Sequence, residues 1–154
     1  MGTEIERKLH VTEAGYKQGS VGDLYRQGYL STAKERTVRV RSAAGKGFIT
    51  VKGPNVGFRR SEFEYEIPLL DAEEMMTLCE GYLIEKLRYR VSHAGVAWEV
   101  DEFLGQNEGL VVAEIELNAE DQRFDLPSWI GVEVTADLRY TNSHLCRKPY
   151  KSWA

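Results

Sequence analysis

Several short segments of this chain place a charged residue at every second position, with an apolar residue between each pair. Residues 62–66 read Glu-Phe-Glu-Tyr-Glu, and residues 38–41 read Val-Arg-Val-Arg. Successive side chains of a β-strand point to opposite faces, so each segment is predicted to be a strand with one charged and one apolar face. This repeated alternation constrains the chain to an antiparallel sheet more than to any helical fold.

The same alternation, together with β-branched and aromatic residues, predicts eight strands and a small ninth at 132–134. The eight lie at 3–11, 26–30, 37–41, 48–52, 58–68, 84–93, 96–103 and 110–117. Helices are expected from Asp71 to about Glu80, ended by Gly81, and weakly over 142–148. We therefore expect a mainly β (α+β) fold, a closed eight-stranded antiparallel barrel with a few flanking helices. Such a barrel can hold one small ligand.

The composition limits the function classes. With 154 residues, the chain is expected to form one domain over 1–154. No apolar run approaches 18 residues and no apolar signal segment opens the chain, which predicts a cytoplasmic protein without a membrane partner. A formal net charge of −4 argues against nucleic acid as a partner. Cys79 and Cys146 lack metal-site spacing and are expected to be free thiols.

The charged faces are sorted by sign, strand by strand. The basic positions are Lys8, Arg39, Arg41, Lys52, Lys86 and Arg88, and the acidic ones are Glu4, Glu6, Glu62, Glu64, Asp101, Glu114 and Glu116. A one-sided sheet would show these faces to water. Alternatively, they line the barrel interior, where opposite signs must compensate because an unpaired buried charge is costly. Solvated faces usually mix charge types, so the sorting favours the interior.

An interior of this kind matches the chemistry of a polyphosphate and its metal. The planar fork of arginine suits phosphate oxygens. A hard cation such as Mg²⁺ binds through carboxylates and substrate phosphates. Phosphoryl transfer asks a protein mainly for positioning and charge neutralisation.

The motif Glu4-x-Glu6-x-Lys8 near the start of the chain resembles the signature of the CYTH domain proteins, or triphosphate tunnel metalloenzymes. Arg39-x-Arg41, Lys52, Glu62-x-Glu64-x-Glu66, Lys86-x-Arg88, Asp101 and Glu114-x-Glu116 follow in the family's order, over nearly the whole chain. The short length resembles the bacterial inorganic triphosphatases. This resemblance implies cleavage of tripolyphosphate to pyrophosphate and phosphate with Mg²⁺ or Mn²⁺, in a barrel that often belongs to a homodimer. It also implies that the segment near 142–148 can plug one end.

The resemblance assigns expected roles. Substrate binding falls to Lys8, Arg39, Arg41, Lys52, Lys86 and Arg88, with Arg60 added by its strand parity, and metal binding to Glu4, Glu6, Asp101, Glu114 and Glu116. Lys86 and the pair Glu62 and Glu64 are the candidate catalytic residues, and the division of that pair between metal binding and water activation stays open. The alternatives are a class IV adenylate cyclase, a thiamine or nucleoside triphosphatase, and a noncatalytic polyphosphate-binding module.

Overall fold

The computed structural model of the protein describes residues 5–56, 59–119 and 121–153. Its nine strands form one sheet in the order β5-β4-β3-β2-β6-β7-β8-β1-β9, and every pairing is antiparallel. The strands are β1 (Ile5–Val11), β2 (Asp23–Ser31), β3 (Thr37–Ala43), β4 (Lys46–Val56), β5 (Arg59–Ile67), β6 (Glu80–His93), β7 (Val96–Phe103), β8 (Val111–Leu117) and β9 (Ile130–Glu133).

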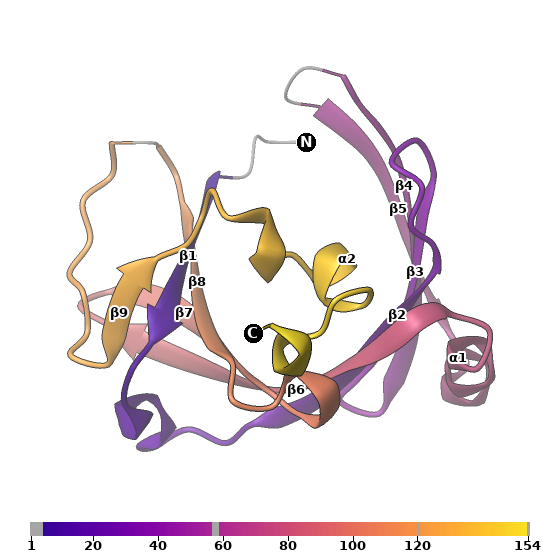
Figure 1. The fold of residues 1–154 in the computed structure, drawn as a ribbon. Coiled ribbons are helices and arrows are strands. Elements are labelled where there is room, and N and C mark those ends of the chain that lie inside the picture. The colour runs from indigo at the N-terminus through magenta and orange to yellow at the C-terminus, as the bar shows by residue number, and fades with distance from the viewer. Residues whose placement is uncertain (1–4, 57–58, 120, 154) are drawn as a thin grey trace.

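The sheet curls into a barrel that is open along one side (Figure 1). The expected mainly β, antiparallel, barrel-like architecture is confirmed, with two differences in detail. The sheet has nine strands, because the predicted small strand joins it as β9 beside β1. Within the described residues, the edge strands β5 and β9 do not pair with each other. The C-terminal segment, residues 138–153, lies on the concave side of the sheet.

The helices are short. They are α1 (Leu69–Met76) and α2 (Asn142–Leu145), with 3₁₀ turns η1 (Ala14–Lys17), η2 (Gly105–Asn107), η3 (Leu138–Tyr140) and η4 (Tyr150–Ser152). The helix predicted from Asp71 starts two residues earlier, after Pro68, and Glu80 already belongs to β6. Gly81 therefore does not end that helix. A Cβ on Gly81, whose φ is +67°, would meet the carbonyl oxygen of Cys146.

Two tight hairpins share the same dipeptide. Ala44-Gly45 joins β3 to β4 with φ values of 50° and 78°, and Ala94-Gly95 joins β6 to β7 with φ values of 49° and 78°. Two successive positive φ angles are typical of type I′ turns, whose twist matches that of the flanking strands. These turns set the register that brings the charged side chains of adjacent strands to one face.

The convex face of the sheet carries the apolar side chains. Trp98, Val100 and Ile115 pack beneath Tyr16 of η1 and Trp129 of the segment before β9, forming one buried cluster. A second cluster packs Val40 of β3 against Ala72 and Met76 of α1. This arrangement decides between the two interpretations of the charged faces, because the apolar faces turn outward to be covered and leave the charged faces on the concave side.

The C-terminal segment fills one end of the concave side. Leu145 and Cys146 are fully buried against Ile84 of β6 and Val112 of β8. Tyr140 joins the same cluster from η3. Burying a leucine-sized side chain contributes roughly 2 kcal/mol, so this apolar contact holds the segment in place. None of the helices in the described part of the chain has the length and apolar character that a membrane crossing requires.

Candidate functional site

The concave face brings together five basic side chains, which we call the basic cluster: Arg39, Arg41, Lys52, Lys86 and Arg88. They come from β3, β4 and β6, with β2 between β3 and β6. In the sheet register, Arg39 pairs with Thr50 of β4, and Thr37 pairs with Lys52. Residues directly opposite each other point to the same face, so the register alone places these cations on one surface.

A pocket of about 730 Å³ opens between this face and the C-terminal segment. Arg39, Lys52 and Arg60 line it from the strands, and His144 and Arg147 line it from α2 and the residues after it. Its charged lining is predominantly cationic, which favours an anionic ligand with several oxygens.

Glu64 of edge strand β5 lies against the cationic surface. Its Oε1 atom lies 3.1 Å from Nη2 of Arg41 and 4.0 Å from Nη2 of Arg39, and it accepts a hydrogen bond from Thr50 at 3.2 Å. Burial lowers the pKa of Arg41, and the neighbouring Arg39 lowers it further, while Glu64 opposes both effects. Glu64 therefore acts as the internal counter-ion of these two arginines, whereas Glu62 lies opposite Lys52 in the register.

Arg60 has the predicted parity, but its guanidinium is used mainly for structure. Its Nε donates to the carbonyl of Gly53 at 2.7 Å, and its Nη2 donates to Thr37 Oγ1 at 2.8 Å and to the carbonyl of Lys34 at 3.3 Å. These bonds tie β5 to β4 and β3.

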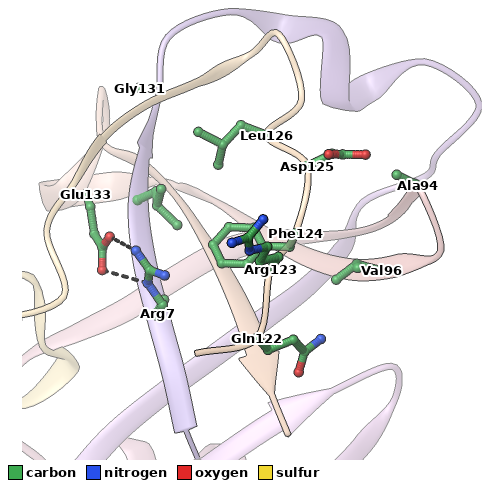
Figure 2. A pocket seen from close by; sticks show the side chains of 11 residues that line it. Arg7, Ala94, Val96, Gln122, Arg123, Phe124, Asp125, Leu126, Gly131 and Glu133 are labelled. Atoms are coloured by element: carbon green, nitrogen blue, oxygen red, sulfur yellow. Dashed lines mark hydrogen bonds and ion pairs between the residues drawn. The ribbon is translucent and has the colours of Figure 1, made fainter. Parts of the chain in front are cut away.

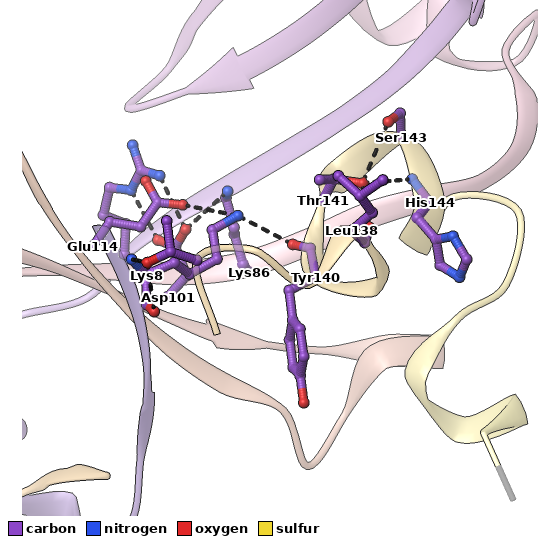
Figure 3. A network of polar contacts seen from close by, with 11 residues as sticks. Lys8, Lys86, Asp101, Glu114, Leu138, Tyr140, Thr141, Ser143 and His144 are labelled. Carbon is purple, nitrogen blue, oxygen red and sulfur yellow. Dashed lines mark hydrogen bonds and ion pairs between the residues drawn. The ribbon is translucent and has the colours of Figure 1, made fainter. Parts of the chain in front are cut away.

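Lys86, Arg88 and Asp101 form an ion-pair triad in which Lys86 and Asp101 are buried and Arg88 is half-buried (Figure 3 shows Lys86 and Asp101). Nζ of Lys86 lies 2.9 Å from Oδ2 of Asp101, and Arg88 donates to both carboxylate oxygens at 2.8 and 3.0 Å. Burial by itself would raise the pKa of Asp101, but the two cations outweigh it and hold the pKa below its usual range. Both oxygens of this predicted metal ligand are therefore engaged by cations.

The acidic side chains gather on the neighbouring strands in what we call the acidic cluster: Glu6, Glu99, Glu114 and Glu116, from β1, β7 and β8. They line a pocket of about 620 Å³. The register pairs Glu6 with Glu116 and Glu99 with Glu114, so like charges face one another across the strands. Such pairs are destabilising unless a cation lies between them. Carboxylate oxygens are the donors that Mg²⁺ and Mn²⁺ prefer.

The acidic cluster is not a preassembled cage. In the described ranges, no three carboxylate, histidine or cysteine side chains converge as closely as a complete metal site requires. Glu4, the first predicted metal ligand, lies outside the described residues. The donor chemistry fits a hard cation, and the remaining ligands would have to come from substrate, water or Glu4.

Lys8 joins the acidic cluster to the C-terminal segment. Its Nζ lies 3.5 Å from Oε1 of Glu114 and donates to the carbonyl oxygen of Tyr140 at 3.1 Å (Figure 3). The predicted phosphate contact thus also anchors η3 in this structure.

A separate pocket, of about 710 Å³, lies on the opposite face of β1 (Figure 2). Arg7 there forms an ion pair with Glu133 and lies over the ring of Phe124, 5.0 Å from its centroid. Arg7 and Lys8 are neighbours in a strand, so this pocket is separated from the charged face by the sheet itself. It is not part of the candidate site.

Three residues of the site were missed by the sequence reasoning: Tyr25, Gln27 and Glu99. Glu99 has the parity of Asp101, a signal available in the sequence. Tyr25 and Gln27 are buried on the concave face of β2, beside Arg41 and Lys86. No charge alternation marks β2, so only its position between two basic strands identifies them.

Comparison with known proteins finds similarity over nearly the whole chain. The CYTH domain family model matches residues 2–149. An inorganic triphosphatase of Acetivibrio thermocellus is 54% identical over 154 residues, which cover 99% of both chains. An inorganic triphosphatase of Nitrosomonas europaea is 37% identical over 148 residues, covering 93% of this chain and 96% of that protein.

Solved structures agree in fold. The crystal structure of the inorganic triphosphatase NE1496 superposes with a TM-score of 0.78 at 35% identity, covering 95% of each chain. A putative adenylate cyclase of Bacillus halodurans, at 17% identity and a TM-score of 0.55, shares the fold alone. The family match and these full-length relatives show that the chain belongs to the CYTH domain family.

Proposed function

We propose that this protein is a metal-dependent inorganic triphosphatase that hydrolyses tripolyphosphate to pyrophosphate and phosphate. The observation that carries the proposal is the meeting of the basic cluster and the acidic cluster on one concave face, where Arg88 lies 3.2 Å from Glu99. The names of the two full-length relatives support the same reaction. We further propose that residues 1–154 work as one catalytic domain.

The basic cluster binds the substrate. Arg39, Arg41 and Lys52 hold phosphate oxygens from β3 and β4, while Lys86 and Arg88 hold them from β6. Lys8 contributes from β1. The guanidinium groups donate charge-assisted hydrogen bonds that both offset the charge of the phosphates and fix their orientation. The terminal phosphate is thereby oriented for attack by water. That attack breaks the bridging P–O bond and releases pyrophosphate, whose negative charge the same cations stabilise.

The acidic cluster holds the metal. Glu6, Glu114 and Glu116, with Glu4, are the proposed ligands, and Glu99 is their neighbour. When bound, the divalent cation neutralises phosphate charge and favours ionisation of water. Asp101, also predicted as a ligand, instead orients Lys86 and Arg88 in this proposal, because both of its oxygens accept bonds from them.

Glu62 and Glu64 are proposed to activate the attacking water. Substrate phosphates would compete with Glu64 for Arg41 and Arg39, which would release its carboxylate to accept a proton. Lys86, buried and held by Asp101, stabilises the negative charge that develops on the phosphate oxygens.

The finer assignments are also proposals. We propose Mg²⁺ or Mn²⁺ as the cation, the cytoplasm as the location, and neither nucleic acid nor membrane as a partner. The outward side chains of Phe63 and Tyr65 on edge strand β5 are 53% and 62% exposed, which supports a homodimer through this face. Sedimentation equilibrium of the purified protein would test the homodimer.

The deciding experiment is a substrate panel. Purified protein with Mg²⁺ or Mn²⁺ is incubated with tripolyphosphate, ATP, GTP and thiamine triphosphate, and phosphate and cyclic AMP are measured. Tripolyphosphate is expected to be the best substrate, with activity abolished by EDTA and restored by excess metal. Cyclic AMP production, or tight tripolyphosphate binding without turnover under any divalent metal, would refute the proposed reaction.

A further inference from the structure

Tyr25 lies in the concave face between the two basic strands of the site. Its strand, β2, separates β3 from β6, and Tyr25 pairs with Ala43 on one side and with Lys86 on the other. The residue is only 7% exposed, although it belongs to none of the three buried apolar clusters. Its burial comes from charged neighbours rather than from the apolar core.

Two guanidinium groups lie against its ring. The Cζ atom of Arg88 is 4.9 Å from the ring centroid, and that of Arg41 is 5.8 Å from it. Both arginines are diagonal neighbours of Tyr25 across the strands, a separation that an aromatic side chain can reach. In addition, the Tyr25 hydroxyl accepts a hydrogen bond of 2.8 Å from Nη2 of Arg90.

This contact addresses a specific electrostatic problem. Arg41 and Arg88 carry like charges on neighbouring parts of one half-buried surface, so they repel each other. An acidic partner of each arginine offsets part of this charge. Arg88 is bonded to Asp101, and Arg41 to Glu64. The electron-rich face of an aromatic ring attracts a cation, so a ring between two guanidiniums stabilises both and sets their separation.

We propose that Tyr25 is a positioning residue that holds Arg41 and Arg88 at the spacing needed to grip the phosphate chain from two strands at once. The proposal rests on the proposed function, since it concerns how the same site binds tripolyphosphate. Tyr25 does not contact the phosphates in this scheme. It acts through the two arginines, with its ring supplying the effect and its hydroxyl steadying Arg90.

The test compares Tyr25→Phe, which keeps the ring, with Tyr25→Leu and Tyr25→Met, which remove it. Loss of two cation–ring contacts should raise the KM for tripolyphosphate by about 5- to 20-fold, with a smaller change in kcat. Tyr25→Phe should stay within about twofold of the wild type, because its ring is retained. Tyr82→Leu, which removes a half-exposed tyrosine at the start of β6, is the matched control and should leave KM unchanged.

A second measurement separates this inference from the reaction itself. Calorimetry measures the binding of tripolyphosphate in the absence of metal, and circular dichroism shows which of the Leu and Met variants folds. Binding should be weaker in the folded ring-free variant and unchanged in Tyr25→Phe. If the wild type binds tripolyphosphate but hydrolyses another triphosphate, the proposed reaction fails while this comparison still decides the role of Tyr25. Wild-type affinity in a folded ring-free variant, or equal damage from Phe and Leu, would overturn the role.

A double variant tests the route of the effect. In an Arg41→Ala background, Tyr25→Leu should weaken tripolyphosphate binding less than it does in the wild-type background, because one of the two positioned groups is already absent. An equal loss in both backgrounds would mean that Tyr25 does not act through Arg41, and would contradict the proposal.

Discussion

Arg88 and Asp101, on the paired strands β6 and β7, form a bidentate ion pair in which Nε and Nη2 of Arg88 lie 2.8 and 3.0 Å from the two carboxylate oxygens. Asp101 is 3% exposed and also pairs with Lys86. A buried carboxylate with two cations is stable only while every member is present. The pair therefore stabilises the fold and also holds basic side chains of the candidate site in place.

Asp101→Asn should lower the free energy of unfolding by about 3–5 kcal/mol, because it removes the negative charge that pairs with buried Lys86 and with Arg88. Urea unfolding at pH 7 measures this loss. Glu108→Gln is the matched control, since its pair with Lys151 is exposed and should contribute less than about 1 kcal/mol. Similar small losses in both variants would contradict the buried-triad account.

The outer pair of Arg7 and Glu133 predicts a pH dependence. The hydrogen bond from Arg7, assisted by one from Thr135, lowers the pKa of Glu133 from 4.5 to about 2. A depressed folded pKa gives stability that is present above 4.5 and is lost as pH falls towards 2. The stability difference between the wild type and Glu133→Gln should therefore be largest near neutral pH and shrink through this window. Unfolding curves recorded from pH 7 to pH 2 test the sign, and a difference that grows on acidification would refute it.

Glu64→Gln should tighten metal-free binding of tripolyphosphate several-fold while lowering kcat. The substitution removes the internal anion from Arg41 and Arg39, so the phosphates no longer compete with it. Isothermal calorimetry measures the affinity, and steady-state phosphate release measures kcat. Glu66→Gln, on the same face of β5, serves as the control. Weaker binding in Glu64→Gln would show that Glu64 does not block these arginines.

Arg41→Ala and Glu116→Ala should both reduce turnover strongly, in different ways. Arg41→Ala removes a phosphate contact and should raise the KM for tripolyphosphate, with a loss in kcat/KM of about 100-fold. Glu116→Ala removes a proposed metal ligand and should raise the Mn²⁺ concentration needed for half-maximal rate. Arg26→Ala, on the convex face of β2, is the control for loss of charge. Normal turnover in both site variants would refute the site assignment.

Leu145→Ala should destabilise the protein by about 2–5 kcal/mol, because this side chain is fully buried between α2 and the concave face. Leu138→Ala, at an exposed position in the same segment, should change stability by less than about 0.5 kcal/mol. Thermal unfolding of the two variants measures the difference. Equal stability would show that the C-terminal segment is not held by this contact.

The strands and their sorted faces could be predicted from the chain alone. Alternation is a local property, and a strand with Val38 and Val40 on one side must show Arg39 and Arg41 on the other. The predicted small strand at 132–134 likewise appears as β9 at 130–133. The helix boundaries near Asp71 and Gly81 were wrong, since β6 begins at Glu80 and Gly81 is needed for the close approach of Cys146.

The sequence by itself determined which strands carry basic side chains and which carry acidic ones, and with them the basic and acidic residues of the candidate site. Only the tertiary structure decided which charges neutralise one another: Asp101 with Lys86 and Arg88, Glu64 with Arg41, and Lys8 with Glu114. It also brought Tyr25 between two basic strands. The reason is that strand parity gives the face of a side chain, while its partners depend on sheet register and curvature, which the whole chain sets together.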